Sequence, residues 1–339
     1  AIILMVMGHV IGDTAATGLR VEDHSLYRHV YFLLEYLRMP LFTVISGFVY
    51  SMLPVALATA PKFLGRKIER LFFPLLTIGT LQYVLHAIIP GTNVAPPLRD
   101  IWMLYVYSHD QFWFLHAIFL VFVTIVALDG FHLMDRLPKW GCCLLATTLL
   151  SLWGPRSEVF SFTGYLNLLP YFVLGCGIYR FPKHIFRREL VLGLCGFLAV
   201  GFYLQECMFE GQLFFVDERI NPVALLVGMT GTVVLFALRK PVRWLAWLGG
   251  YSYGIFLLHV FPVAGSRIVL MKLGLHNREV LFVIGLLCGL SVPILLEIAI
   301  RKNPHLQRFL LGERPKVAST RPNSITSNAG AGVRTADSC

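Results

Sequence analysis

Long apolar runs are the feature that most constrains this chain. They occupy residues 1–12, 37–56, 71–90, 111–129, 141–153, 163–179, 189–209, 220–238, 246–265 and 279–300. A helix rises about 1.5 Å per residue, so a run of about 20 residues crosses the ~30 Å hydrocarbon layer of a bilayer. The runs are continuously apolar, which favours helices over alternating strands. We therefore predict an all-α, polytopic integral membrane protein with about ten transmembrane helices, the first of them truncated.

The composition excludes the soluble classes. Hydrophobic residues make up 56% of the 339 residues and charged residues only 14%, whereas soluble domains carry about 25% charge. A net charge of +10 can indicate a nucleic-acid partner, but the basic residues here stand in short loops between apolar runs. We expect the lipid bilayer as a partner and no nucleic acid.

The basic residues also predict an orientation. When alternate loops are assigned to the two sides of a membrane, most of the 29 Lys and Arg residues fall on one side, together with the tail from Arg301. The positive-inside rule makes that side cytoplasmic, so the C-terminus is cytoplasmic. We divide the chain into a membrane domain, 1–300, and a basic tail, 301–339, which we predict to be disordered; residues 315–339 in particular have too few large apolar side chains to fold.

The seven cysteines carry no metal-site or disulfide signature. Neither a Cys-x-x-Cys motif nor a Cys/His ligand spacing is present. We read them as small apolar packing residues and predict no metal and no permanently bound cofactor.

Ionisable side chains inside apolar runs are expensive and are therefore functional candidates. His9 lies near the end of the first run, and Asp13 follows four residues later, where a continuous helix would place both on one face. A neutral imidazole is a suitable general base near pH 7, and a carboxylate could orient it. The alternative is an interfacial histidine that is bonded to a neighbour.

Two further charge pairs have helical spacing. Glu35 and Arg38 are three residues apart before Met39; they form an interfacial ion pair, or Arg38 holds an anionic or hydroxylated substrate with its fork of donors. Lys67 and Arg70 are one helical turn apart and present two cations, which suits a phosphorylated ligand. The alternative for this second pair is membrane anchoring.

Three aromatic or polar residues complete the set of candidates. Trp113 precedes His116 by three residues, and a packing or cavity role is the commoner one for such a histidine. His259 shares its segment with Tyr251, Ser252 and Tyr253, which favours a polar helix face. We regard these three residues, with Glu35 and Arg38, as acceptor-binding or structural polar groups.

Five segments resemble the acyltransferase-3 family of integral membrane acyltransferases, which includes bacterial O-acetyltransferases of surface polysaccharides. They are AIILMVMGHVIG (1–12), RMPLFTVISGFVY (38–50), KIERLFFPLL (67–76), FWFLHAIFL (112–120) and YSYGIFLLHVFPV (251–263). Each is weak alone, but all five occur in the family's order and extend over nearly the whole membrane region.

The resemblance implies about ten helices and transfer of an acyl group from cytosolic acyl-CoA to a hydroxyl, usually of a carbohydrate. The family's opening-helix histidine, its proposed catalytic residue, matches His9, and its donor-linked basic pair matches Lys67 and Arg70. An arginine that the family has eleven positions before this histidine would precede Ala1. We expect an O-acetyltransferase that uses acetyl-CoA as co-substrate and modifies a cell-surface or periplasmic glycan. We expect it in a bacterial inner membrane.

Other functions stay open at this point. A many-helix chain with buried polar residues also fits a transporter or flippase for a polar lipid-linked glycan, although no internal repeat is visible. A glycan polymerase would need a longer outer loop. Within the acyltransferase hypothesis, both direct transfer and a covalent histidine intermediate are compatible with the sequence.

Overall fold

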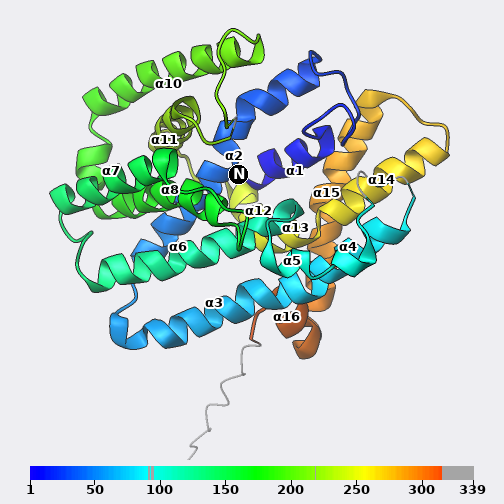
Figure 1. The fold of residues 1–339 in the computed structure, drawn as a ribbon, viewed down its shortest axis with the longest axis horizontal. Coiled ribbons are helices and arrows are strands. Elements are labelled where there is room, and N and C mark those ends of the chain that lie inside the picture. The colour runs from blue at the N-terminus through cyan, green and yellow to red at the C-terminus, as the bar shows by residue number, and fades with distance from the viewer. Residues whose placement is uncertain (91, 93–94, 218, 315–339) are drawn as a thin grey trace, which may run out of the picture.

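The computed structural model describes residues 1–90, 92, 95–217 and 219–314, and its regular elements are helices (Figure 1). They are α1 (Ile2–Ile11), α2 (Leu26–Met52), α3 (Ala60–Pro74), α4 (Thr80–Ile88), α5 (Met103–Val106), α6 (Trp113–Gly130), α7 (Leu137–Trp153), α8 (Phe162–Arg180), α9 (Pro182–Ile185), α10 (Arg188–Phe209), α11 (Pro222–Ala237), α12 (Arg243–Gly250), α13 (Ser252–Leu258), α14 (Val260–Lys272), α15 (Arg278–Ile300) and α16 (Pro304–Leu311). The predicted all-α class is confirmed.

The described residues contain five helices that are long and apolar enough to cross a membrane, or six if the bent pair α13–α14 counts as one span. Every predicted run overlaps one or more helices, but the predicted number of about ten spans is not confirmed. Two of the runs correspond to α1 and α11, which are apolar but shorter than 18 residues. The chain is a multi-pass membrane protein.

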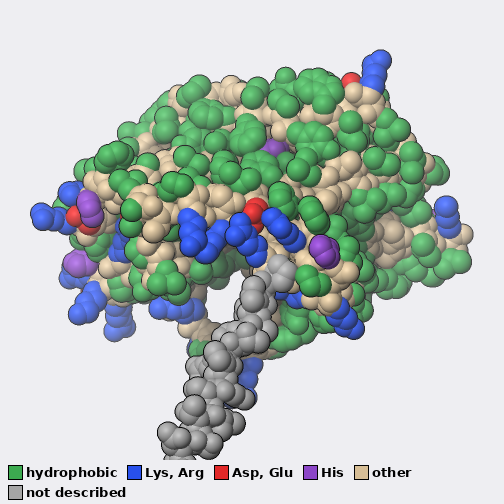
Figure 2. Space-filling model, turned by 90° about the horizontal axis from the view of Figure 1, so that it is seen from below, with side chains coloured by type: hydrophobic (Ala, Val, Ile, Leu, Met, Phe, Trp, Pro, Cys, Tyr) green, Lys and Arg blue, Asp and Glu red, His purple; other side chains and the backbone are tan. Residues whose placement is uncertain are grey.

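The outer surface of the bundle is apolar, as a lipid-facing surface requires. On α10, Phe197 and Tyr203 are 60% and 69% exposed, and on α15 Leu287 is 61% exposed. Figure 2 shows hydrophobic side chains over most of the face seen from below, with Lys and Arg side chains near the point where the described chain ends. In water such a surface would cause aggregation, whereas in a bilayer it meets acyl chains.

Helix α2 packs backbone to backbone against α8 at the centre of the bundle. A side chain on Gly47 would overlap the carbonyl oxygen of Phe172, and one on Gly175 would overlap the carbonyl oxygen of Val44. Small residues allow this close approach of membrane helices, whose association cannot rely on the hydrophobic effect. The contact fixes α2, which carries several of the polar side chains described below.

Helix α2 begins at Leu26, eleven residues before the predicted start of the second run at 37. The side chain of Ser25 caps it by accepting a hydrogen bond from the Arg28 backbone N–H. The predicted run begins only at 37 because Arg28 and Glu35 interrupt the apolar residues before it, and Arg38 follows just inside the run. Their spacing places them on one helix face, which packs inside the protein instead of facing lipid.

The predicted continuous span 246–265 is wrong. Helix α12 ends at Gly250, and α13 and α14 meet at His259 with a bend of 51°. The Nδ1 atom of His259 lies 3.0 Å and 2.9 Å from the carbonyl oxygens of Ile255 and Phe256. The ring therefore satisfies carbonyl groups next to the break, which is one way in which a bent membrane helix is tolerated.

The prediction of disorder is wrong for the first part of the tail. Helix α16 packs on α3, and its Phe309 carbonyl oxygen accepts a hydrogen bond of 2.9 Å from the Thr77 hydroxyl. Thr77 belongs to a π-helical turn, Leu75–Gly79, that follows Pro74. Residues 315–339, for which the sequence predicts disorder, lie outside the described residues.

Candidate active site

Two histidines from distant parts of the chain meet inside the bundle. The ring centres of His9 on α1 and His259 at the α13–α14 bend are 4.7 Å apart, and the rings are tilted by 58°. His259 is completely buried. The His9 side chain is exposed, although its neighbours Gly8 and Val10 are buried. The His9 ring is therefore open to its surroundings, while the neighbouring His259 ring is enclosed by protein.

Arg38 lies beside the same pair. A side chain on Gly8 would overlap the Arg38 guanidinium group, so this group rests directly on α1 one residue from His9. The Arg38 Cζ atom is 4.3 Å from the centre of the Tyr31 ring. The Cζ atom of Arg28 is 5.8 Å from that ring, and its Nη1 atom donates to the Gly12 carbonyl oxygen. A polar face of α2 thus borders His9.

The expected contact between His9 and Asp13 is absent from the described part of the chain. Helix α1 ends at Ile11 and Gly12 has a φ of 86°, so Asp13 leaves the helix before it can share a face with His9. The Asp13 carboxylate accepts a 2.8 Å hydrogen bond from the Thr17 hydroxyl and lies 3.7 Å from Arg219. The i, i+4 prediction is wrong because it assumed a helix that continues past Gly12.

Arg219 connects Asp13 with another predicted residue. Its Nε atom is 3.6 Å from Oε1 of Glu35, and its Nη2 atom approaches Asp13. This arginine comes from the connection between α10 and α11. It joins that connection to α1 and α2, so Glu35 and Asp13 fulfil an ion-pair role at the edge of the site.

Trp113 and His116 lie in another part of the bundle. The Trp113 ring fills the space beside Gly164 on α8, where a side chain would come within 2.7 Å of it. His116 is completely buried, and its ring centre is 4.6 Å from that of Phe160. Its Nδ1 atom is 3.5 Å from the Ser161 hydroxyl. Within the described residues, neither side chain forms a ring contact or hydrogen bond with His9.

Lys67 and Arg70 lie on α3 and face the interior of the protein. The Lys67 Nζ atom is 3.9 Å from the Phe122 ring centre and 5.2 Å from that of Phe63. In the part of the chain that the structure describes, no carboxylate lies within ion-pair distance of Lys67. Its charge is therefore held by aromatic faces and is available to an anion.

Arg70, in contrast, is paired with the segment that follows α16. Its Nη1 atom contacts Oε1 of Glu313 and donates a 3.2 Å hydrogen bond to the Leu311 carbonyl oxygen. Arg301 binds the same Glu313 carboxylate, at 2.5 Å from Nη1 to Oε2 and 3.0 Å from Nη2 to Oε1. Two guanidinium groups thus converge on one carboxylate, an arrangement that would bind any small oxyanion.

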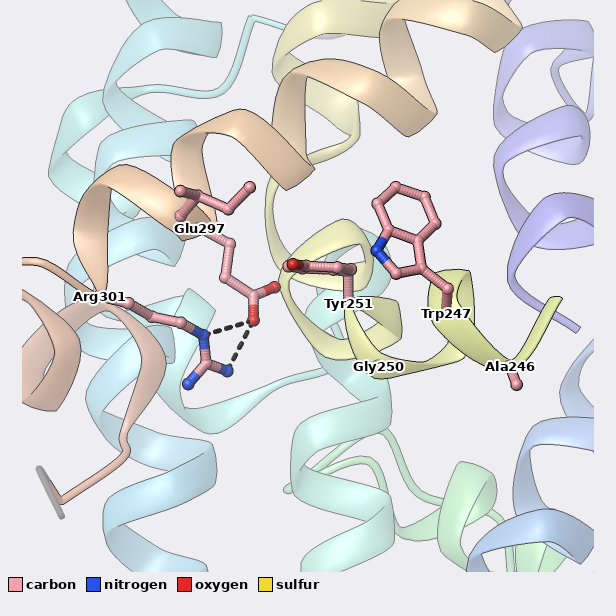
Figure 3. Close-up of a pocket in the computed structure, with 7 residues that line it drawn as sticks. Ala246, Trp247, Gly250, Tyr251, Glu297 and Arg301 are labelled. Atoms are coloured by element: carbon pink, nitrogen blue, oxygen red, sulfur yellow. Dashed lines mark hydrogen bonds and ion pairs between the residues drawn. The ribbon is translucent and has the colours of Figure 1, made fainter. Parts of the chain in front are cut away.

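We call Lys67, Arg70 and Arg301 the cation cluster. Arg301 also binds Glu297 on α15, at 2.9 Å and 2.6 Å. This pair lines a pocket of about 480 Å³. In Figure 3 the Glu297 carboxylate lies between Arg301 and Tyr251, with Trp247 and Gly250 on the far side of Tyr251. The pocket lies between the ends of α12 and α15.

Helix α13 connects the cation cluster to the histidines. At its beginning, the Tyr253 ring centre is 3.8 Å from the Arg70 Cζ atom, and the Tyr253 hydroxyl donates to the Arg70 carbonyl oxygen. At its end stands His259, six residues later. With a rise of about 1.5 Å per residue, the two positions are about 9 Å apart along the helix. An anion at one end and a reacting group near the other could belong to one extended molecule.

Sequence reasoning missed several residues that the structure brings to these places. Once the helix is extended to Leu26, Arg28, Tyr31 and Arg38 stand at i, i+3 and i+10 and share one face of α2. Arg301 stands four residues after Glu297, a visible helical pair. Glu313 had no local signal, because its partners lie on α3 and at the end of α15.

A family model described as an acyltransferase domain matches residues 1–300. The chain belongs to the acyltransferase-3 family. The matched region includes both histidines and the α3 cations, and it ends just before Arg301 and α16. Comparison with curated proteins and with solved structures gave no match. Membership of this family shows that the protein is a membrane acyltransferase. Its acyl donor and its acceptor are proposed below.

Proposed function

We propose that the protein is a membrane O-acyltransferase that moves an acyl group, most simply acetyl, from cytosolic acyl-CoA to a carbohydrate hydroxyl. The single observation that carries the proposal is the exposed imidazole of His9 within a domain that belongs to an acyltransferase family. A carbohydrate hydroxyl is a poor nucleophile, so it needs a base within hydrogen-bond reach as it attacks a thioester.

The proposed step balances around His9. The hydroxyl oxygen forms a bond to the thioester carbonyl carbon while its proton passes to a His9 nitrogen. The carbon–sulfur bond breaks, and the leaving CoA thiolate takes the proton back from the imidazolium. The products are the acyl ester and CoA, and His9 returns to its neutral form.

The donor side of the proposal rests on the cation cluster. CoA carries several phosphate charges, and Lys67 offers a charge that no described carboxylate neutralises. Arg70 and Arg301 already hold the carboxylate of Glu313. A donor phosphate would therefore replace Glu313 at these guanidinium groups or bind beside them at Lys67. The thioester end would then extend along α13 towards His9.

The acceptor side rests on the polar face of α2. Arg38 and Tyr31 border His9, and the Arg38 side chain is half-buried. Guanidinium donors bind hydroxyl and anionic oxygens, and a tyrosine ring offers a flat apolar face to a sugar. We place the acceptor on this side, with the membrane of a bacterial cell and a cytoplasmic C-terminus as the proposed location.

Isotope transfer tests the proposal directly. Membranes that contain the full chain are supplied with acetyl-labelled acetyl-CoA and with the glycan fraction of the producing cell. We expect label in an ester on the glycan, released by mild base. A flippase would move the glycan and leave it unlabelled, which would contradict the proposal.

A further inference from the structure

His259 has one nitrogen whose role the structure fixes and one whose role it leaves open. Its Nδ1 atom faces the carbonyl oxygens of Ile255 and Phe256 at 3.0 Å and 2.9 Å. Carbonyl oxygens only accept hydrogen bonds, so Nδ1 carries the proton. In the neutral ring, Nε2 is then an acceptor with a free lone pair.

This Nε2 atom is buried and has no hydrogen-bond partner among the described residues. A buried acceptor without a donor is uncommon and calls for an explanation. The neighbouring ring is that of His9, at 4.7 Å between centres. The nearby cation, Arg38, lies on the Gly8 side of α1, and Asp13 has turned away to Thr17 and Arg219.

We propose that His259 is a positioning residue whose Nε2 atom accepts a hydrogen bond from His9 when substrates are bound. This inference rests on the proposed function. One His9 nitrogen then carries a proton that points to His259, and the other presents its lone pair to the acceptor hydroxyl. Catalytic hydrogen bonds are often long in structures without ligands and shorten in the substrate complex.

The two histidines are not interchangeable in this arrangement. His259 is completely buried, so a sugar hydroxyl cannot reach it, whereas His9 is exposed. His259 gains and loses no proton during transfer. Its Nδ1–H stays on the carbonyl oxygens at the helix bend, which holds Nε2 in place, and the proton taken from the hydroxyl passes from His9 to the CoA sulfur.

Two substitutions at this position separate positioning from folding. In His259→Asn, the amide occupies the place of Nδ1 and can still donate to the carbonyl oxygens at the bend, but it does not reach His9. In His259→Gln, the longer side chain carries its amide oxygen to the place of Nε2 and can accept from His9. The pair therefore divides the two functions of the ring.

Acetyl transfer is measured with both variants in detergent or membranes, with kcat and the acetyl-CoA KM determined separately. We expect His259→Asn to lose at least about tenfold in kcat, part of the ~10²–10⁴ that a positioned base supplies, with KM and thermal unfolding near wild type. His259→Gln should recover most of this kcat. In a His9→Ala background, His259→Asn should cause no further loss, because both residues act as one unit.

The outcomes distinguish this inference from the proposed function. If the wild-type chain transfers no label, the proposed function fails. If it transfers label and the Asn and Gln variants have equal kcat, His259 does not position His9. A loss in both variants that follows their thermal unfolding would assign His259 to the helix bend alone and overturn the inference.

Discussion

The two ends of α13 differ in how far their polar groups are satisfied. At the His259 end, two imidazoles and the Arg38 guanidinium group lie close together, and the His259 Nε2 atom has no partner among the described residues. At the Tyr253 end, Arg70 and Arg301 share the carboxylate of Glu313. The His259 end can interact with a ligand without breaking an existing contact. At the Tyr253 end, a new anion must displace the Glu313 carboxylate or bind at Lys67.

The largest effect is expected at the histidine end. His9→Ala should lower acetyl transfer by about 10³-fold, within the range that a general base contributes. The amount of protein in the membrane should stay normal, because His9 makes no structural hydrogen bond within the described chain. Label transfer from acetyl-CoA is the measurement, and His276→Ala, at an exposed loop position, is the matched control. Undiminished transfer would remove His9 from the reaction.

A second change at the same end tests the position of Arg38. Gly8→Ala introduces a methyl group where the Arg38 guanidinium group now lies, so this side chain must move. We expect kcat to fall by roughly tenfold, since small displacements of positioning groups are costly in catalysis. Gly265→Ala on α14 is the control, because nothing lies within 4 Å of the added methyl group. Equal activities of the two variants would exclude a role of Arg38 at His9.

At the cation end we expect an effect on binding instead of turnover. Lys67→Ala combined with Arg70→Ala should raise the acetyl-CoA KM by about tenfold and change kcat less, because these groups bind a part of the donor that does not react. The control is Lys183→Ala with Arg187→Ala, which removes the same charge at exposed positions. An unchanged KM would show that the donor binds elsewhere.

The variant Glu313→Gln tests whether a donor phosphate displaces the Glu313 carboxylate from the cation cluster. The substitution removes a negative charge that competes for Arg70 and Arg301, so the acetyl-CoA KM should fall, by roughly threefold for a partly solvated ion pair. Steady-state kinetics at low ionic strength measure this shift, and added salt should reduce it. A higher KM would mean that Glu313 holds the arginines in place for the donor.

The smallest effect is a pH dependence of α16 docking. Burial raises the pKa of Glu313, but Arg70, Gln307 and Arg301 outweigh burial and hold this pKa below its usual range. The stabilising contribution is therefore complete above the ordinary carboxyl pKa and is lost as pH falls through the lowered value. Hydrogen exchange of α16, corrected for intrinsic rates, should approach that of Glu313→Gln in acid, and equal protection at all pH values would refute the linkage.

Sequence reasoning succeeded where the information is local. Apolar runs of bilayer length identify most helices, and the cost of placing an imidazole inside such a run marks His9 and His259 as candidates, together with His116. It failed at Asp13 because Gly12, a common helix terminator, was not used to end the helix. The meeting of His9 with His259, and of Arg70 with Glu313, could not be read at all, because tertiary packing alone brings together residues so far apart in the chain.

The distance along the chain between the two histidines has a consequence for biosynthesis. His9 belongs to α1, which leaves the ribosome before the other described helices, and His259 follows only after α13 has been made. At about 5–20 residues per second, the earlier helices wait many seconds in the membrane before the second ring arrives. A nascent or prematurely terminated chain therefore contains the first imidazole without its neighbour, and we expect such fragments to be catalytically silent.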